Sequence, residues 1–262
     1  MAKAAESPTG VVVRGQRMLG GVSGAIPPWR EVSEDPNAPA VLSANQRVLD
    51  ATRAAPVGDR VAYLCELARD RRVLDVGVVE HRLESRSSNR WLHGRLAATA
   101  KECVGVDVLE HEAQALRDEG FDVRVHDLTV EPLAERFDVI VAGEVIEHVG
   151  APEWLLANCR SMLDDGGRLV VTTPNPYALY RVWHALRGRH SDSADHVALL
   201  APSHMLELGR RAGLELRQWR GVRLPGMRSL RGRTIGSMRR ALAQGLFRVE
   251  ADCDPLIFEY SA

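Results

Sequence analysis

The chain has 262 residues, of which 45% are hydrophobic and 26% are charged, and its formal net charge is −1. This is the composition of a globular protein large enough for one α/β domain with additions. The near-zero charge gives no general reason to expect binding to nucleic acid or to a membrane surface. No apolar run reaches the roughly 20 residues of a membrane span, and the first residues lack a secretion signal. The four cysteines form no Cys-x-x-Cys pair, so we expect a cytoplasmic protein.

Residues 1–41 are rich in glycine, proline and alanine, which predicts an irregular N-terminal arm. Residues 42–262 are expected to form one domain that begins with two helices broken near Pro56 and Gly58. Strand and helix patterns then alternate, which predicts an α/β fold with a parallel sheet and helices on both faces. The expected strands are 73–76, 104–107, 122–125, 137–141, 168–172, 215–219 and 255–260, and the expected helices are 91–100, 111–118, 152–163 and 203–212.

Three of the expected strands end in residues that suit a nucleotide-like ligand. Asp75 and Gly77 end the first strand, and glycine allows the backbone to turn and to approach a ligand without a Cβ. Asp107 ends the second strand, where a carboxylate can accept hydrogen bonds from both hydroxyls of a ribose. Asp127 follows the third strand. These side chains are expected at one edge of the sheet, where open α/β sheets bind their ligands.

In their order along the chain, these strand ends resemble the cofactor motifs of class I S-adenosylmethionine (SAM)-dependent methyltransferases. The resemblance covers residues 70–215 and implies a Rossmann-like sheet of seven strands with helices on both faces. It also implies that SAM contacts a set of strand-end residues, namely Asp75, Gly77, Asp107, Asp127 and Gly143. The chain departs from the family pattern D-x-G-x-G-x-G, because Val79 and His81 stand where the second and third glycines would lie.

The helix after this altered loop begins with Trp91 and His93. Either residue could stand near the cofactor in place of the missing glycines. The simpler interpretation is that Trp91 belongs to the core and that His93 is a surface residue.

A cluster of titratable residues, Glu144, Glu147 and His148, follows the strand 137–141. In a helix or a tight turn these side chains would share a face, and converging carboxylates need a cation or a network of donors. The same E-x-x-E-H string occurs in ubiquinone-type O-methyltransferases and in small-RNA 3′-end 2′-O-methyltransferases. That resemblance implies that the cluster binds Mg²⁺ or Mn²⁺. His196 is the candidate for a fourth ligand, and His204 is the second choice.

Two interpretations of this cluster involve no metal. In one, His148 acts alone as the general base of catalysis and Glu147 orients its ring. In the other, the cluster is purely structural, with Glu144 capping the turn.

Seven arginines and no acidic residue lie between residues 220 and 240, in an expected basic insert near 220–250. Guanidinium groups suit phosphate or carboxylate, so this insert could favour an anionic acceptor or RNA. A solvated basic surface or a contact within a homodimer is the more common cause of such a run of arginines.

Taken together, the motifs predict an enzyme that transfers a methyl group from SAM to a hydroxyl of a small molecule, with a sugar or a secondary metabolite as the favoured acceptor. Two alternatives remain. One is an RNA ribose 2′-O-methyltransferase, although the net charge makes nucleic acid the less favoured partner. The other is a non-catalytic relative, suggested by Val79 and His81.

Overall fold

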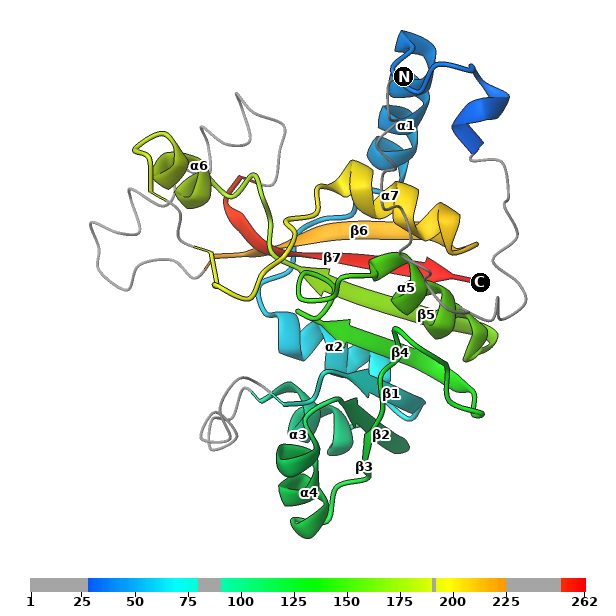
Figure 1. The fold of residues 1–262 in the computed structure, drawn as a ribbon, viewed down its shortest axis with the longest axis vertical. Coiled ribbons are helices and arrows are strands. Elements are labelled where there is room, and N and C mark those ends of the chain that lie inside the picture. The colour runs from blue at the N-terminus through cyan, green and yellow to red at the C-terminus, as the bar shows by residue number, and fades with distance from the viewer. Residues whose placement is uncertain (1–27, 80–90, 190–191, 225–250) are drawn as a thin grey trace, which may run out of the picture.

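The computed structural model describes residues 28–79, 91–189, 192–224 and 251–262 (Figure 1). A 3-10 helix at Pro28–Glu31 comes first, and the other elements follow in the order α1 (Pro39–Thr52), α2 (Arg60–Ala68), β1 (Arg72–Val76), α3 (Leu92–Ala97), β2 (Glu102–Asp107), α4 (Glu110–Asp118), β3 (Val123–Val125), β4 (Phe137–Gly143), α5 (Pro152–Ser161), β5 (Leu163–Thr173), α6 (Leu179–Ala185), α7 (Pro202–Arg211), β6 (Glu215–Arg223) and β7 (Cys253–Ser261).

The seven strands form a single sheet in the order β3-β2-β1-β4-β5-β7-β6. The first five are parallel to one another, whereas β7 is antiparallel to both β5 and β6. The predicted fold class, a Rossmann-like sheet of seven strands in an α/β domain, is therefore confirmed. Because β1 is flanked by β2 and β4, connections leave it in opposite directions, and ligands of open α/β sheets bind at such a switch point.

Helices cover both faces of the sheet (Figure 1). On one face, α1, α5 and α7 pack in a large apolar cluster with alternate residues of the strands. On the other face, α2 and α3 pack in a second cluster. In α2 the buried residues Val61, Leu64, Cys65 and Ala68 recur at the three- and four-residue spacing that places side chains on one face of a helix. Among the described helices, none has the length and apolar character that a membrane span requires.

The observed elements differ from the predicted ones in three respects. Strand β5 begins at Leu163, before the two glycines expected to lie between a helix and this strand. Helix α1 begins at Pro39, inside the expected irregular arm. Helix α6, which was not predicted, has no buried residue and lies apart from the sheet in Figure 1. Its apolar side chains Leu179, Val182 and Trp183 are exposed and do not pack on the sheet.

Candidate functional site

A cavity of about 760 Å³ lies at the carboxyl ends of β1, β2, β3 and β4, within the usual size range of small-molecule sites. Every predicted strand-end and cluster residue lines it: Asp75, Gly77, Asp107, Asp127, Gly143, Glu144, Glu147, His148 and His196. The structure therefore places the candidate cofactor residues and the candidate catalytic residues around one space.

Gly77 turns the chain at the end of β1 in a conformation that other residues rarely adopt. Its φ is +73°, and a Cβ here would approach Cγ2 of Val145 to under 3.0 Å. Its N–H donates to the carbonyl of Val106 in β2, 2.8 Å away. The missing side chain thus allows the loop after β1 to pack against the turn after β4.

Asp107 and Asp127 hold the loops beyond β2 and β3. The carboxylate of Asp107 is 8% exposed and accepts from the N–H of Val79 at 2.9 Å and of Leu109 at 3.1 Å. Asp127 is exposed and accepts from the N–H of Thr129 at 2.8 Å. Asp107 therefore fixes the first residue of the altered loop, while Asp127 leaves most of its carboxylate open to solvent.

The interpretation of His93 as a surface residue is wrong. Only 1% of the residue is exposed, and its Nδ1 lies 3.0 Å from Oδ2 of Asp75. Helix α3 begins at Leu92, which turns His93 towards the sheet. Trp91 is buried as expected, and its indole N–H donates to the carbonyl of Val78 at 3.2 Å. His81 lies outside the described residues.

Glu144 begins the turn that follows β4. Glu144 has a φ of +60°, in the left-handed region. Its carboxylate accepts from the hydroxyl of Thr172 at 3.0 Å and lies 3.8 Å from the guanidinium of Arg60. Glu144 is not part of the group of potential ligand atoms described next, although its charge is close enough to raise the pKa of Glu147.

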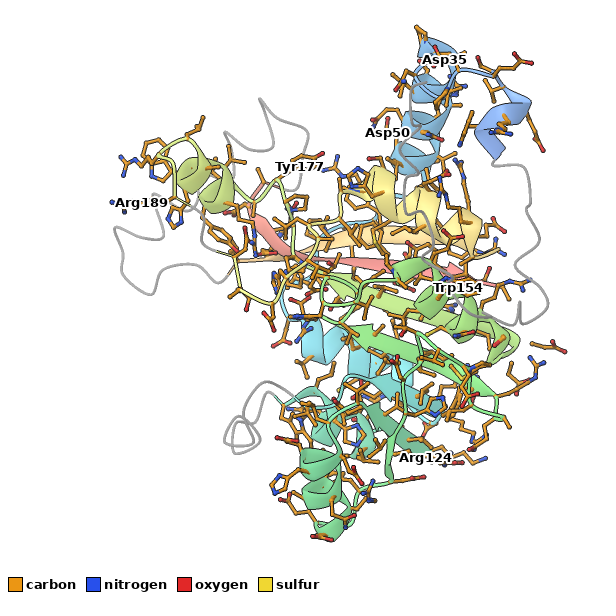
Figure 2. The ribbon with its side chains drawn as sticks, in the orientation of Figure 1. Asp35, Asp50, Arg124, Trp154, Tyr177 and Arg189 are labelled. Carbon is orange, nitrogen blue, oxygen red and sulfur yellow. The ribbon has the colours of Figure 1, made fainter. Side chains whose placement is uncertain are left out.

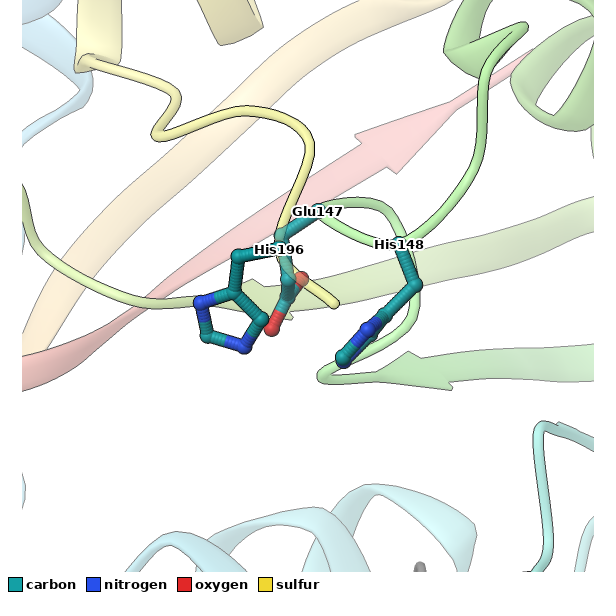
Figure 3. A group of neighbouring side chains, drawn as sticks. All are labelled: Glu147, His148 and His196. Carbon is teal, nitrogen blue, oxygen red and sulfur yellow. The ribbon is translucent and has the colours of Figure 1, made fainter. Parts of the chain in front are cut away.

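Glu147, His148 and His196 come together instead, as Figure 3 shows. One potential ligand atom from each residue lies within 4.8 Å of the other two. The main chain brings the distant His196 here, because Val197 and Ala198 donate their N–H groups to the carbonyl of Glu147 at 2.8 and 3.3 Å. His204, the second choice of ligand, instead accepts from the N–H of Ala201 at the start of α7.

The carboxylate of Glu147 is fully buried. It accepts from the hydroxyl of Thr173 at 3.2 Å, whereas its Oε1 has no partner among the described residues. Burial, followed by repulsion from Glu144, raises the pKa of Glu147 to about 8. Burial also raises the pKa of Glu144. A buried carboxylate with one oxygen lacking a hydrogen-bond partner among the described residues, beside two imidazoles, is a donor set that fits a divalent cation.

Two residues of the cavity were missed by the sequence analysis. Asp195 lies 3.2 Å from Nδ1 of His148, so Asp195 can orient the ring. Arg60 of α2 donates to the hydroxyl of Thr172 at 3.1 Å and lies beside Gly143, where a Cβ would be 3.5 Å from its Nη1. Neither residue belongs to a local motif, and only the fold brings them to the cavity.

Few of the arginines of the basic insert lie among the described residues. Arg220 and Arg223 are part of β6, and the other five fall outside the described ranges. Arg220 stacks over the ring of Tyr63 at 4.7 Å and donates to the side chain of Gln218 at 2.6 Å. Neither Arg220 nor Arg223 lines the cavity. Trp154 and Tyr177, which are labelled in Figure 2, are exposed and do not line the cavity either.

Comparisons with known proteins agree with this geometry. A family model described as a methyltransferase domain matches residues 49–218. The ubiquinone biosynthesis O-methyltransferase of Cereibacter sphaeroides is 31% identical over 134 residues, which are 46% of this chain and 54% of that protein. The corresponding enzyme of Aeromonas salmonicida is 27% identical over 166 residues, 58% of this chain and 66% of that protein. The chain thus spans about half to two thirds of the length of these curated relatives.

The fold is shared with solved structures at low sequence identity. A SAM-dependent methyltransferase from Thermotoga maritima aligns with a TM-score of 0.52 at 16% identity, over 83% of this chain and 91% of that one. A SAM-dependent methyltransferase from Archaeoglobus fulgidus aligns with a TM-score of 0.50 at 18% identity, over 77% and 90%. With a family model matching well over half of its length, the chain belongs to the methyltransferase-domain family, among the class I SAM-dependent methyltransferases.

Proposed function

We propose that this protein transfers a methyl group from SAM to a hydroxyl of a small molecule, and that Glu147, His148 and His196 activate that hydroxyl around a divalent cation. The observation that carries this proposal is the convergence of these three side chains on the cavity that the strand-end residues also line. When bound, SAM supplies an electrophilic methyl group, so what remains for the protein is to align and deprotonate the acceptor.

The residues of the cavity fit SAM. Asp107, at the end of β2, suits the ribose hydroxyls, and Asp127 has carboxylate capacity left for the adenine amino group. Gly77, whose φ is positive, and Gly143, which neighbouring side chains approach closely, have no side chains of their own. Their absence leaves room in the cavity. The guanidinium of Arg60 suits the carboxylate of the methionine part.

A cation held by one carboxylate and two imidazoles would lower the pKa of a hydroxyl bound to it. Imidazole ligands suit Mn²⁺ better than Mg²⁺, which prefers oxygen donors. Glu147 supports this role, because a carboxylate with a pKa near 8 binds a proton at neutral pH unless a cation replaces it. His148 also has the arrangement of a general base, since Asp195 can accept from Nδ1–H and leave Nε2 to take a proton. An experiment must therefore distinguish catalysis assisted by a metal from catalysis by His148 as a metal-free general base.

The acceptor class rests on two supports. The O-methyltransferases named above act in ubiquinone biosynthesis, which favours a hydroxyl acceptor here. A cavity of about 760 Å³ suits a small molecule together with the cofactor. We keep a sugar or a secondary metabolite as the proposed acceptor and place a phenol beside it. The RNA alternative has no support among the described residues, because the described arginines of the insert lie outside the cavity.

The test is a titration with Mn²⁺, followed by the paramagnetic signal of the free ion, and then methyl transfer from labelled SAM to sugars and phenols. We expect one Mn²⁺ site that is lost in His196→Ala and in Glu147→Gln. His126→Ala is the matched control, because His126 lines the cavity but donates to the carbonyl of Glu131 at 2.8 Å. Methyl transfer that survives chelation and is lost only in His148→Ala would establish the metal-free base.

A further inference from the structure

Trp91 is fastened to the loop that follows β1. Its indole N–H donates to the carbonyl of Val78 at 3.2 Å, and the residue is 7% exposed. The N–H of the next loop residue, Val79, donates to the carboxylate of Asp107 at 2.9 Å. Trp91, Val78 and Val79 all line the cavity. The main chain of this loop is therefore held by two side chains, one from the residue before α3 and one from the end of β2.

The ring of Trp91 has a fixed place. Gly94 in α3 makes room for it, because a Cβ on Gly94 would lie 2.5 Å from Cε3 of Trp91. Glycine is unfavourable inside a helix, and the close approach of the ring accounts for it here. The ring of Phe121 meets that of Trp91 edge to face, with centroids 5.1 Å apart and planes at 84°, which is a favoured arrangement of aromatic rings. The indole therefore has little freedom to turn away from Val78.

The same ring anchors the valine that stands at the position of the second glycine of the family pattern. Val78 is 2% exposed and packs with Trp91 in an apolar cluster with residues of α4 and β3, and Val79 packs against that cluster. Glycine lets a loop approach its ligand because it has no Cβ. Valine does not, but a valine packed in an apolar cluster restricts its own main chain. Here the cluster, and not a row of glycines, sets the path of the loop.

On the basis of the proposed function, we propose that Trp91 is a positioning residue for the cofactor: its indole N–H and its packing hold the loop after β1 in the conformation that binds SAM. The apparent dissociation constant of a ligand rises as the binding-competent conformation of the protein becomes less populated. A hydrogen bond of ordinary strength changes such a population by roughly 3- to 10-fold. The affinity for the cofactor therefore depends on the indole N–H, although this group bonds to the protein and not to the ligand.

The test uses Trp91→Phe, which keeps an aromatic ring in the cluster and removes the N–H donor. Trp219→Phe is the matched control. The indole N–H of Trp219 also donates to a main-chain carbonyl, that of Leu49 at 2.8 Å, but Trp219 does not line the cavity. Calorimetry measures the affinity for S-adenosylhomocysteine (SAH), the demethylated product of SAM, and urea unfolding measures stability. We expect both variants to lose stability, but only Trp91→Phe to bind SAH roughly 3- to 10-fold more weakly.

Tryptophan fluorescence gives a second readout. All five tryptophans lie in the part of the chain that the structure describes, and among them Trp91 alone lines the cavity. Binding of SAH should therefore change the emission of the wild-type protein and of Trp219→Phe, and this change should be absent in Trp91→Phe. A change that persists in Trp91→Phe would contradict the place of Trp91 beside the cofactor.

An unchanged affinity for SAH in Trp91→Phe would overturn the inference, and so would an equal loss of affinity in Trp219→Phe, which is the result of a purely structural role. If Trp91→Phe does not fold, Gly94→Ala takes its place, because the new Cβ displaces the ring of Trp91 without removing it, and SAH is expected to bind more weakly there too. A wild-type protein that does not bind SAH would contradict the proposed function itself. The two failures are thus distinguishable.

Discussion

Replacing Gly77 with alanine is expected to destabilise the protein and to weaken its binding of SAH. A left-handed backbone costs a residue with a Cβ about 1–2 kcal/mol, and the φ of Gly77 is +73°. The overlap of the new Cβ with Val145 adds about 1–3 kcal/mol of overpacking. The free energy of unfolding should therefore fall by about 2–5 kcal/mol. Because Val145 lines the cavity, its displacement should also weaken SAH about tenfold or more, since a tenfold change corresponds to about 1.4 kcal/mol.

Gly166 is the matched control for this prediction. Its φ is +75°, but a Cβ there would meet nothing within 4 Å. In Gly166→Ala we expect only the backbone strain of about 1–2 kcal/mol and an unchanged affinity for SAH. Urea unfolding and calorimetry measure the two quantities. Equal losses of stability in both variants, with SAH binding intact in both, would refute the close packing of the loop after β1 on the turn after β4.

Three further predictions concern the cavity. In the metal-free protein, raising the pH from about 4.5 to about 8 should lower the free energy of unfolding, because the raised pKa makes native Glu147 bind a proton that the unfolded chain releases. Urea unfolding at several pH values should show a smaller fall in Glu147→Gln. An equal fall in both proteins would contradict a raised pKa of Glu147. Arg60→Gln should lower the affinity for SAH roughly 10-fold in calorimetry but leave the affinity for 5′-methylthioadenosine, which lacks the amino-acid part, unchanged. An equal loss of affinity for both ligands would count against a contact between Arg60 and the ligand carboxylate. Asp107→Ala should weaken both ligands alike and lower the free energy of unfolding by about 1–3 kcal/mol, because two N–H groups lose their acceptor; unchanged affinities would remove Asp107 from the ribose site.

The alternation of strands and helices and the placement of the strand-end residues could be predicted from the sequence. Parallel strands joined by helices bring their carboxyl ends to one edge, so Asp75, Asp107 and Asp127 had to lie near one another once the strands were recognised. The same rule placed His148 at this edge. His196 required a resemblance to known enzymes, because its loop reaches the site through main-chain hydrogen bonds to Glu147.

The remaining features depend on tertiary contacts without a local pattern. The left-handed backbone of Glu144 could not be predicted, since glutamate rarely adopts it. Arg60 reaches the cavity from a helix that precedes the first strand, and Asp195 reaches it from a loop after the fifth. The burial of His93 follows from the place where α3 begins, beyond residues whose sequence departs from the family pattern.

The measurement that tests the account most directly is a calorimetric titration of the purified protein with SAM and SAH, with and without Mn²⁺. The account predicts saturable binding of both at a single site. It also predicts a heat of Mn²⁺ binding that disappears in Glu147→Gln. The absence of binding for SAM and for SAH under both conditions would contradict it.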